Sequence, residues 1–160
     1  MNYSDLNVLN EGDWTDSSGN KISFQSIVKE IDSLDCEIYV GADSNPSRIP
    51  IVLAVSIVVI KRNEFAKYFF FRMKPWDNNR PQLRMRLQDE VVCSCYVASQ
   101  IREMLPDREI IVHADINPDQ RTASGKFANS LKNYITAFGF PSNIKPMSWA
   151  ASCVADKCAG

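Results

Sequence analysis

The sequence contains one histidine, His113, and this scarcity excludes several classes of enzyme. A Ser-His-Asp triad or a Cys-His pair would have to use that single residue, and no Gly-x-Ser-x-Gly motif is present. A glycine-rich phosphate loop of the usual spacing is also lacking, which argues against a nucleotide-binding enzyme of the actin-like ATPase architecture. The activity therefore has to be sought outside the common nucleophilic and nucleotide-binding motifs.

Cysteine pairs and long hydrophobic runs are missing as well. The five cysteines are odd in number and form no Cys-x-x-Cys motif, so neither a disulfide framework nor a zinc ribbon is expected. The longest apolar run, residues 49–60, includes Pro50 and Ser56 and is well short of the about 20 residues that a membrane helix needs. No basic stretch precedes an apolar segment near the N-terminus. We therefore expect a cytoplasmic protein with reduced cysteines and no membrane partner.

Neither sign of charge is in large excess. Eighteen Lys and Arg residues stand against nineteen Asp and Glu residues, and the net charge of -1 indicates no bulk positive field for nucleic acid. The acids are unevenly placed, because residues 1–20 contain four of them and no Lys or Arg, which leaves a charge of +3 on the rest of the chain. We predict that residues 1–20 are an acidic, flexible segment and that residues 21–160 form one domain.

Hydrophobic periodicity predicts the elements of that domain. A helix over residues 21–33 is followed by three runs rich in strand formers, whose short connections favour antiparallel hairpins. Helices and strands then alternate, which requires covered, right-handed crossovers between parallel strands. The expected elements are strands at 37–43, 51–60 and 65–72, a helix at 81–106, a strand at 109–115, a helix at 127–138, a strand at 143–145 and a last helix capped by Ser148. This order predicts an α/β fold of ribonuclease H-like architecture, a mixed five-stranded sheet with helices on both faces, whose first and fourth strands are parallel neighbours.

Two acids end neighbouring strands of this predicted sheet. Asp43 and Asp115 each stand at the carboxyl end of an apolar strand, where open α/β sheets bind ligands. The long helix adds Glu90, which lies about 60° from the centre of the apolar stripe, whereas Asp89, about 160° away, is expected in solvent. The last helix adds Asp156, which ends the helix face that we expect to dock on the sheet. Four acids are thus expected to converge at one end of the sheet.

Clustered carboxylates repel one another, so a set of this kind needs protons or cations to compensate it. Mg²⁺ or Mn²⁺ held by carboxylates can clamp the attacking and leaving oxygens of a phosphodiester when two ions lie about 3.5–4 Å apart. We therefore predict metal-assisted phosphodiester hydrolysis, with the four acids as metal ligands and catalytic residues. Plainer interpretations exist for each acid: a strand-end turn for Asp43 and Asp115, and a solvated helix position for Glu90 and Asp156.

Four sequence blocks resemble the YkuK family of ribonuclease H-like proteins. They are Gly41-Ala42-Asp43-Ser44, Arg86-Leu87-Gln88-Asp89-Glu90, His113-Ala114-Asp115-Ile116 and Lys145-Pro146-Met147-Ser148-Trp149-Ala150-Ala151-Ser152-Cys153-Val154-Ala155-Asp156-Lys157. The resemblance spans roughly residues 24–158, and the last block is the most specific. It implies that Asp43, Glu90, Asp115 and Asp156 correspond to the acidic tetrad of ribonuclease H-like nucleases. The loop Asn117-Pro118-Asp119-Gln120 departs from the family pattern, which usually has a glycine directly after the Asp-Ile pair.

Further residues are candidates for contacts with substrate, namely Ser44, His113, Lys145, Ser148 and Lys157. A buried, hydrogen-bonded histidine and solvated lysines are the simpler alternatives.

A basic and aromatic segment is formed by Trp76, Arg80, Arg84 and Arg86. It could follow a nucleic-acid backbone while the indole stacks on a base, or Trp76 could simply cover the hairpin. Taken together, these expectations favour a divalent-metal-dependent nuclease whose partner is RNA, DNA or a hybrid. The alternative is a catalytically inactive ribonuclease H-like module that binds nucleic acid or protein.

Overall fold

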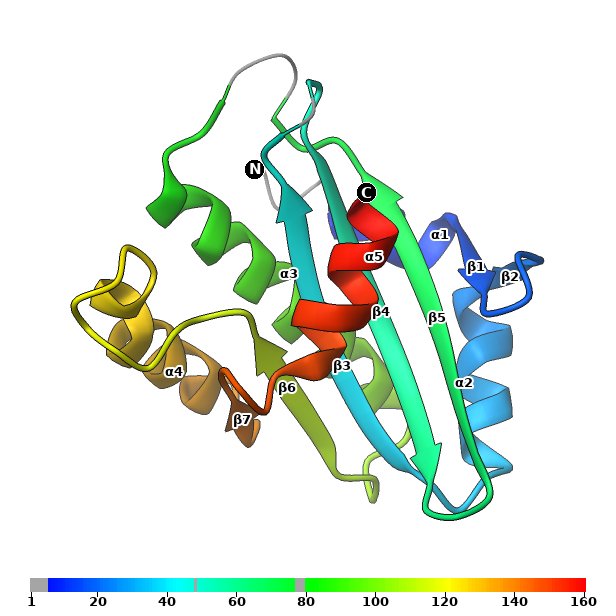
Figure 1. The fold of residues 1–160 in the computed structure, drawn as a ribbon. Helices are drawn as coiled ribbons and strands as arrows, with labels where there is room; N and C mark the ends of the chain where they lie inside the picture. Colours follow the sequence, from blue (N-terminus) through cyan, green and yellow to red (C-terminus); the bar gives the residue numbers. More distant parts are fainter. Residues whose placement is uncertain (1–5, 48, 77–79) are drawn as a thin grey trace.

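In the computed structural model, which describes residues 6–47, 49–76 and 80–160, a seven-stranded sheet is flanked by helices (Figure 1). The strands lie in the order β2-β1-β5-β4-β3-β6-β7. Their bounds are Asp13–Asp16 (β1), Lys21–Ser23 (β2), Glu37–Asn45 (β3), Val52–Lys61 (β4), Phe65–Met73 (β5), Ile110–Ala114 (β6) and Ser142–Asn143 (β7). The helices are Val8–Glu11 (α1), Phe24–Asp32 (α2), Leu83–Met104 (α3), Ala128–Ala137 (α4) and Asp156–Ala159 (α5), with a 3₁₀-helix at Gly125–Phe127 and a π-helix at Ala150–Ala155.

The centre of the sheet consists of three antiparallel strands that follow one another along the chain. All nine residues of β3 pair with β4, and β4 pairs in turn with β5. The turn between β4 and β5 holds Asn63 at φ 62°, a left-handed conformation that asparagine tolerates better than most residues. The antiparallel arrangement expected from the short connections is confirmed.

Strand β6 lies on the other side of β3 and runs parallel to it. The register pairs Ala42 with Ala114, so Asp43 and Asp115 are the next residues on the two strands. The parallel arrangement arises because α3 connects the hairpins to β6 as a crossover over one sheet face. The predicted fold class is therefore correct, and the two acids lie at the same edge of the sheet.

The sheet differs from the expected one by two additional strands, seven instead of five, and both come from residues 13–23. Strands β1 and β2 form a hairpin that extends the sheet beyond β5. In the hairpin turn, Asp16 Oδ1 accepts the backbone N–H groups of Ser18 and Asn20, each at 2.8 Å, and Gly19 has a φ of 89°. The turn-forming residues that suggested a mobile segment instead close a β-hairpin.

Helix and strand are present in the N-terminal segment from residue 6 onward, whereas residues 1–5 of the segment expected to be flexible, residues 1–20, lie outside the described residues. Trp14 is fully buried in the core, and its Nε1–H donates to the Leu9 carbonyl oxygen at 2.7 Å. A buried indole with a satisfied N–H outweighs the acidic composition of the segment. The helix expected from residue 21 begins only at Phe24, because Lys21–Ser23 belong to the hairpin.

Helices cover the two sheet faces unequally (Figure 1). The main core lies between the sheet and the helices α2 and α3, which contribute buried residues such as Ile27, Ile31 and Ala98. On the opposite face the C-terminal helical segment lies over β3 and β4. Among the described residues, none of the helices combines the length and apolar content that crossing a membrane requires.

Close backbone contact holds the C-terminal segment on that second face. A Cβ atom on Gly41 would lie 2.6 Å from Ala151 N, so only glycine allows the π-helix to approach β3 this closely. Ser56 Oγ donates to the Ala150 carbonyl oxygen at 2.8 Å. The predicted α-helix capped by the Ser148 side chain is wrong in detail. Residues Ala150–Ala155 form a π-helix, and the buried Ser148 hydroxyl makes no hydrogen bond to any of the described residues.

Candidate functional site

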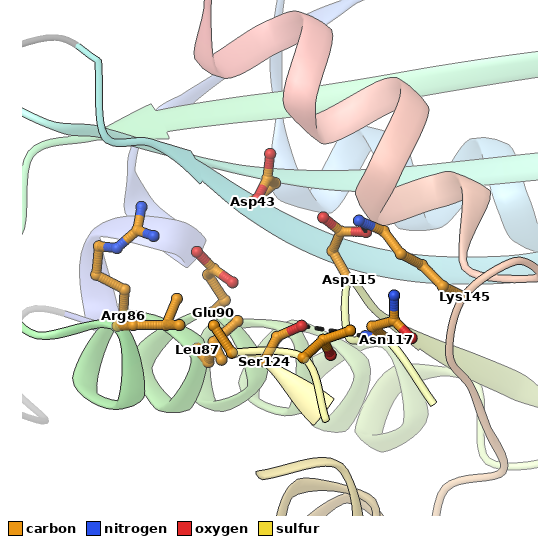
Figure 2. A pocket seen from close by; sticks show the side chains of 11 residues that line it. Asp43, Arg86, Leu87, Glu90, Asp115, Asn117, Ser124 and Lys145 are labelled. Atoms are coloured by element: carbon orange, nitrogen blue, oxygen red, sulfur yellow. Dashed lines mark hydrogen bonds and ion pairs between the residues drawn. The ribbon is translucent and has the colours of Figure 1, made fainter. Parts of the chain in front are cut away.

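Three of the four predicted acids line one cavity at the carboxyl ends of β3 and β6. The cavity has a volume of about 380 Å³ and is bordered by Asp43 from β3, Glu90 from α3 and Asp115 directly after β6 (Figure 2). Two cations, Arg86 and Lys145, also border it and lie on opposite sides of the carboxylates in this view. Elements far apart in the sequence thus bring three acids and two bases together.

Asp43 is half-buried and lies close to two other carboxylates. Burial, followed by the negative charge of Asp115, raises the pKa of Asp43 to about 7, and the charge of Asp156 adds to this effect. A hydrogen bond from the Ser44 backbone N–H acts in the opposite direction. The Asp43 carboxyl group is therefore partly protonated near neutral pH, and a nearby cation would favour its ionised form.

Glu90 is the most deeply buried acid of the site, with 5% of its surface exposed. Ser44 Oγ donates to Glu90 Oε1 at 2.5 Å, and Arg86 Nη1 donates in turn to Ser44 Oγ at 3.2 Å. Burial, with a smaller contribution from the charge of Asp43, raises the pKa of Glu90 to about 8. The helix phase that favoured Glu90 over Asp89 is confirmed by this burial.

Asp115 pairs with a base rather than with a hydrogen-bond network. Lys145 Nζ lies 3.0 Å from Asp115 Oδ1, and the Lys145 side chain remains 44% exposed. The Oδ1 atom is inaccessible to solvent, and among the described residues it accepts no hydrogen bond beyond this ion pair. A metal ion that binds this oxygen would therefore compete with the Lys145 ammonium group.

Asp156 lies at the start of α5 and is not among the residues that line the cavity. Its side chain is exposed, and both its charge and a side-chain hydrogen bond with Asp43 contribute to the raised pKa of Asp43. The structure therefore brings all four predicted acids into one neighbourhood. Within the described ranges, however, no three His, Cys, Asp or Glu side chains are arranged as a group that could hold a metal ion.

The predicted substrate contacts are distributed between the cavity and the interior. Lys145 lines the cavity, whereas Lys157 is exposed on α5 and does not. Ser44 and Ser148 are 4% and 0% exposed, so neither hydroxyl can reach a ligand in this conformation. Ser44 instead supports Glu90 through its hydrogen bond.

His113 is a buried structural residue. It is 1% exposed, and Nδ1 accepts the Ala150 backbone N–H at 3.1 Å. Its ring lies 4.9 Å from the Tyr39 ring and 5.0 Å from the Trp149 ring, measured between centroids. Burial lowers the pKa of His113 to about 4, so the imidazole is neutral at physiological pH. His113 is therefore a buried, hydrogen-bonded histidine and not a surface residue that contacts substrate.

The predicted basic and aromatic surface does not form. Trp76 is buried in the main core, and its Nε1–H donates to Asp89 Oδ2 at 2.7 Å, so its ring cannot stack on a base. Asp89, expected in solvent, is half-buried for the same reason. Arg86 turns away from Arg84 toward Ser44 at the cavity. Trp76 thus has the covering role that was the alternative interpretation.

Sequence reasoning did not identify the second wall of the cavity. It is formed by the loop after Asp115, which contributes Asn117, Thr122, Ala123 and Ser124. The only signal for this wall was the departure of the loop from the family pattern, which could not indicate where its side chains lie.

Comparison with protein families supports the same fold. The chain matches the family model described as Ribonuclease H-like over residues 22–160, which includes all four acids and both cations of the cavity. The searches against curated proteins and against solved structures returned no match. A match of this extent, together with the sheet topology, shows that the chain belongs to the ribonuclease H-like family.

Proposed function

We propose that the protein is a divalent-metal-dependent nuclease of YkuK type that hydrolyses phosphodiester bonds in RNA or DNA. The observation that carries this proposal is the cavity lined by Asp43, Glu90 and Asp115 from three separate elements, with Asp156 beside it. Stability alone does not select such a cluster, because partly buried carboxylates repel one another. The membership of the chain in the ribonuclease H-like family is consistent with this proposal.

The donor chemistry of the site suits Mg²⁺ or Mn²⁺. All four candidate ligands are carboxylates, the oxygen donors that hard divalent cations prefer. Among the described residues, none donates a hydrogen bond to the buried Oδ1 atom of Asp115, and burial, followed by the negative charge of Asp115, raises the pKa of Asp43. Asp43, Asp115 and Asp156 would hold the metal, and Glu90 would join them on leaving its bond with Ser44.

The basic side chains of the cavity, Arg86 and Lys145, have a role different from that of the metal in this proposal. When bound, the metal would activate a water molecule and stabilise the charge that develops on the phosphate. Lys145 and Arg86, on either side of the carboxylates, would contact phosphate oxygens and orient the backbone (Figure 2). Arg86 donates to Ser44 through Nη1, and its other guanidinium donors make no hydrogen bond to the described residues, so they would serve such a contact.

Cleavage assays test this function directly. The purified protein would be incubated with Mg²⁺ or Mn²⁺ and labelled single strands, duplexes and RNA/DNA hybrids. We expect cleavage that falls about a hundredfold or more in Asp43→Asn and Glu90→Gln, because each removes a metal ligand. The matched control is Asp107→Asn, which removes one exposed acid remote from the cavity lining and should cleave like the wild type. Cleavage at the wild-type rate by both Asp43→Asn and Glu90→Gln would contradict the proposal.

A second candidate, a ribonuclease H-like module that binds nucleic acid or protein without turnover, is favoured by one observation. In the described part of the chain the acids are not gathered into a metal-binding group, and Lys145 already neutralises Asp115. Calorimetric titration with Mn²⁺ separates the two functions. Absence of metal binding together with a gel shift of labelled nucleic acid would favour the inactive module over the nuclease.

A further inference from the structure

The wall of the cavity opposite the carboxylates has a defined chemistry of its own. Asn117, Thr122, Ala123 and Ser124 line it, and all four follow Asp115 on one loop. None of these side chains carries a charge, so the wall neither competes with the acids for a metal nor repels a phosphate. It is suited to neutral, hydrogen-bonding parts of a ligand.

Internal hydrogen bonds hold this loop in place. Thr122 Oγ1 donates to the Asp119 carbonyl oxygen at 2.7 Å and accepts the Gly125 backbone N–H at 3.1 Å. Asn117 Oδ1 accepts the Asp119 backbone N–H at 2.9 Å, and Ser124 Oγ accepts the Asn117 backbone N–H at 3.3 Å. A Cβ atom on Gly125 would lie 2.0 Å from the Asp119 carbonyl oxygen, which shows how closely the loop folds on itself. The wall is therefore preorganised and does not depend on a ligand for its shape.

Two hydrogen-bond donors on the wall remain available in addition to these internal hydrogen bonds. The Asn117 side-chain NH₂ group makes no hydrogen bond within the described chain, and in Figure 2 it points toward Asp115 and Lys145. The Ser124 hydroxyl accepts one bond and still has its proton to donate. Both donors suit the oxygen and nitrogen acceptors that a nucleotide presents beside its phosphate.

The size of the cavity limits what can occupy the space between the two walls. Its volume of about 380 Å³ lies at the lower end of the range for sites that enclose one small molecule. In a duplex the nucleotide next to each phosphate is stacked and paired, and its extraction costs energy that a single strand does not lose. A single strand can therefore place a phosphate against the acids and its neighbouring nucleotide against the loop.

We propose that the cavity takes one nucleotide of a single-stranded nucleic acid, next to the phosphate to be hydrolysed, and that Asn117 and Ser124 contact this nucleotide. The inference rests on the proposed nuclease function and assigns its substrate class. It also assigns a role to the loop that departs from the family pattern.

Cleavage of one sequence presented as a single strand, a DNA duplex and an RNA/DNA hybrid tests the inference. We expect the single strand to be cleaved about tenfold faster or more. Asn117→Asp keeps the oxygen that accepts the Asp119 N–H but replaces the NH₂ donor with an oxygen that repels phosphate, and it should lower kcat/KM on the single strand about tenfold. Ala123→Trp, a larger side chain at an exposed lining position, should also reduce cleavage by filling the cavity. Gln120→Ala, on the same loop but outside the lining, is the matched control and should not change the rate.

The outcomes distinguish a failure of the single-strand assignment from a failure of the proposed nuclease function. Equal or faster cleavage of duplex or hybrid overturns the single-strand assignment and leaves the nuclease proposal intact. If no substrate is cleaved, fluorescence anisotropy with the same labelled single strand and duplex, in Ca²⁺, decides the question. Preferential binding of the single strand that Asn117→Asp and Ala123→Trp remove supports the inference in an inactive protein, and equal binding of both probes overturns it.

Discussion

Strands β3 and β6 carry two polar clusters that differ in how their polar atoms are satisfied. The ring cluster, Tyr39, His113 and Trp149, lies along the strands, and its ring centroids are 4.7–5.0 Å apart. The acid cluster, defined by Asp43, Glu90, Asp115 and Asp156, lies where the strands end.

In the ring cluster, burial is compensated. His113 Nδ1 accepts the Ala150 N–H, the imidazole is neutral, and the rings pack on one another. In the acid cluster, burial raises the pKa values of Asp43 and Glu90, and Asp115 Oδ1 accepts no hydrogen bond. The contrast indicates that the middle of these strands stabilises the fold, whereas their ends hold groups at a cost in stability, as functional sites commonly do.

The largest effect is expected from breaking the ring cluster. His113→Ala removes a fully buried ring and leaves the Ala150 N–H without an acceptor, so the free energy of unfolding should fall by about 3 kcal/mol. Urea unfolding followed by tryptophan fluorescence measures this loss. His113→Asn, which can place an oxygen near the position of Nδ1, should recover part of it. If His113→Ala is as stable as the wild type, the ring cluster does not have the anchoring role described above.

A smaller effect is expected from Gly41, which contacts the backbone segment between Trp149 of the ring cluster and Asp156 of the acid cluster. Gly41→Ala places a Cβ atom 2.6 Å from Ala151 N and should destabilise the fold by about 2 kcal/mol, because the π-helix has to move away from β3. The displacement would also carry Asp156 away from Asp43. We therefore expect reduced Mn²⁺ affinity by calorimetry in the folded variant, and unchanged affinity would show that Asp156 is not held through this contact.

The acid cluster should make stability depend on pH. Asp43 and Glu90 have pKa values of about 7 and about 8 in the folded chain, above the ordinary values of 3.8 and 4.5. The folded state therefore binds more protons than the unfolded state between these limits, and the free energy of unfolding falls as pH rises from about 5 to about 8. Allowing for relaxation and partial solvation, we expect a loss of about 1–2 kcal/mol.

Thermal unfolding at a series of pH values measures this slope. The double variant Asp43→Asn, Glu90→Gln should flatten it, and saturating Mg²⁺ should reduce it in the wild type by compensating the charges. A wild-type slope of zero or of opposite sign would contradict the description of the acid cluster as uncompensated.

The smallest effect on stability is expected from the ion pair at the cavity mouth. Lys145→Met removes a partly exposed ammonium group from Asp115, and the free energy of unfolding should change by less than about 1 kcal/mol. Calorimetric titration should nevertheless give tighter Mn²⁺ binding, because the metal no longer competes with an ammonium for Asp115. Weaker binding would indicate that Lys145 does not compete with the metal.

Much of the acid cluster could be predicted because it follows from local periodicity. Alternation along two apolar strands places Asp43 and Asp115 at their ends, and the phase of one helix separates Glu90 from Asp89. These are short-range geometric properties of strands and helices, which the order of residues determines directly.

The failures concern contacts between distant segments. Residues 16–20 indicate either a turn or a mobile segment, because nothing nearby reveals that the preceding strand pairs with β5, more than fifty residues later. Helix phase alone places Asp89 in solvent, but its carboxylate accepts the Nε1–H of Trp76, which lies 13 positions earlier in the chain. Ser44 was considered a substrate contact, but its partner is Glu90 on a helix 46 positions away.

The sequence by itself determined the order of the elements from residue 24 onward and singled out the four acids, because strand alternation, helix phase and turn chemistry act over a few residues. Only the tertiary structure decided what surrounds those acids: the ion pair of Lys145 with Asp115, the hydrogen bond of Ser44 with Glu90, and the loop wall that contains Asn117. Burial and side-chain pairing depend on which distant segments pack together, and that information is distributed over the whole chain. The same packing raises the pKa values of Asp43 and Glu90 and places the solvent-inaccessible Oδ1 atom of Asp115 beside the Lys145 ammonium group.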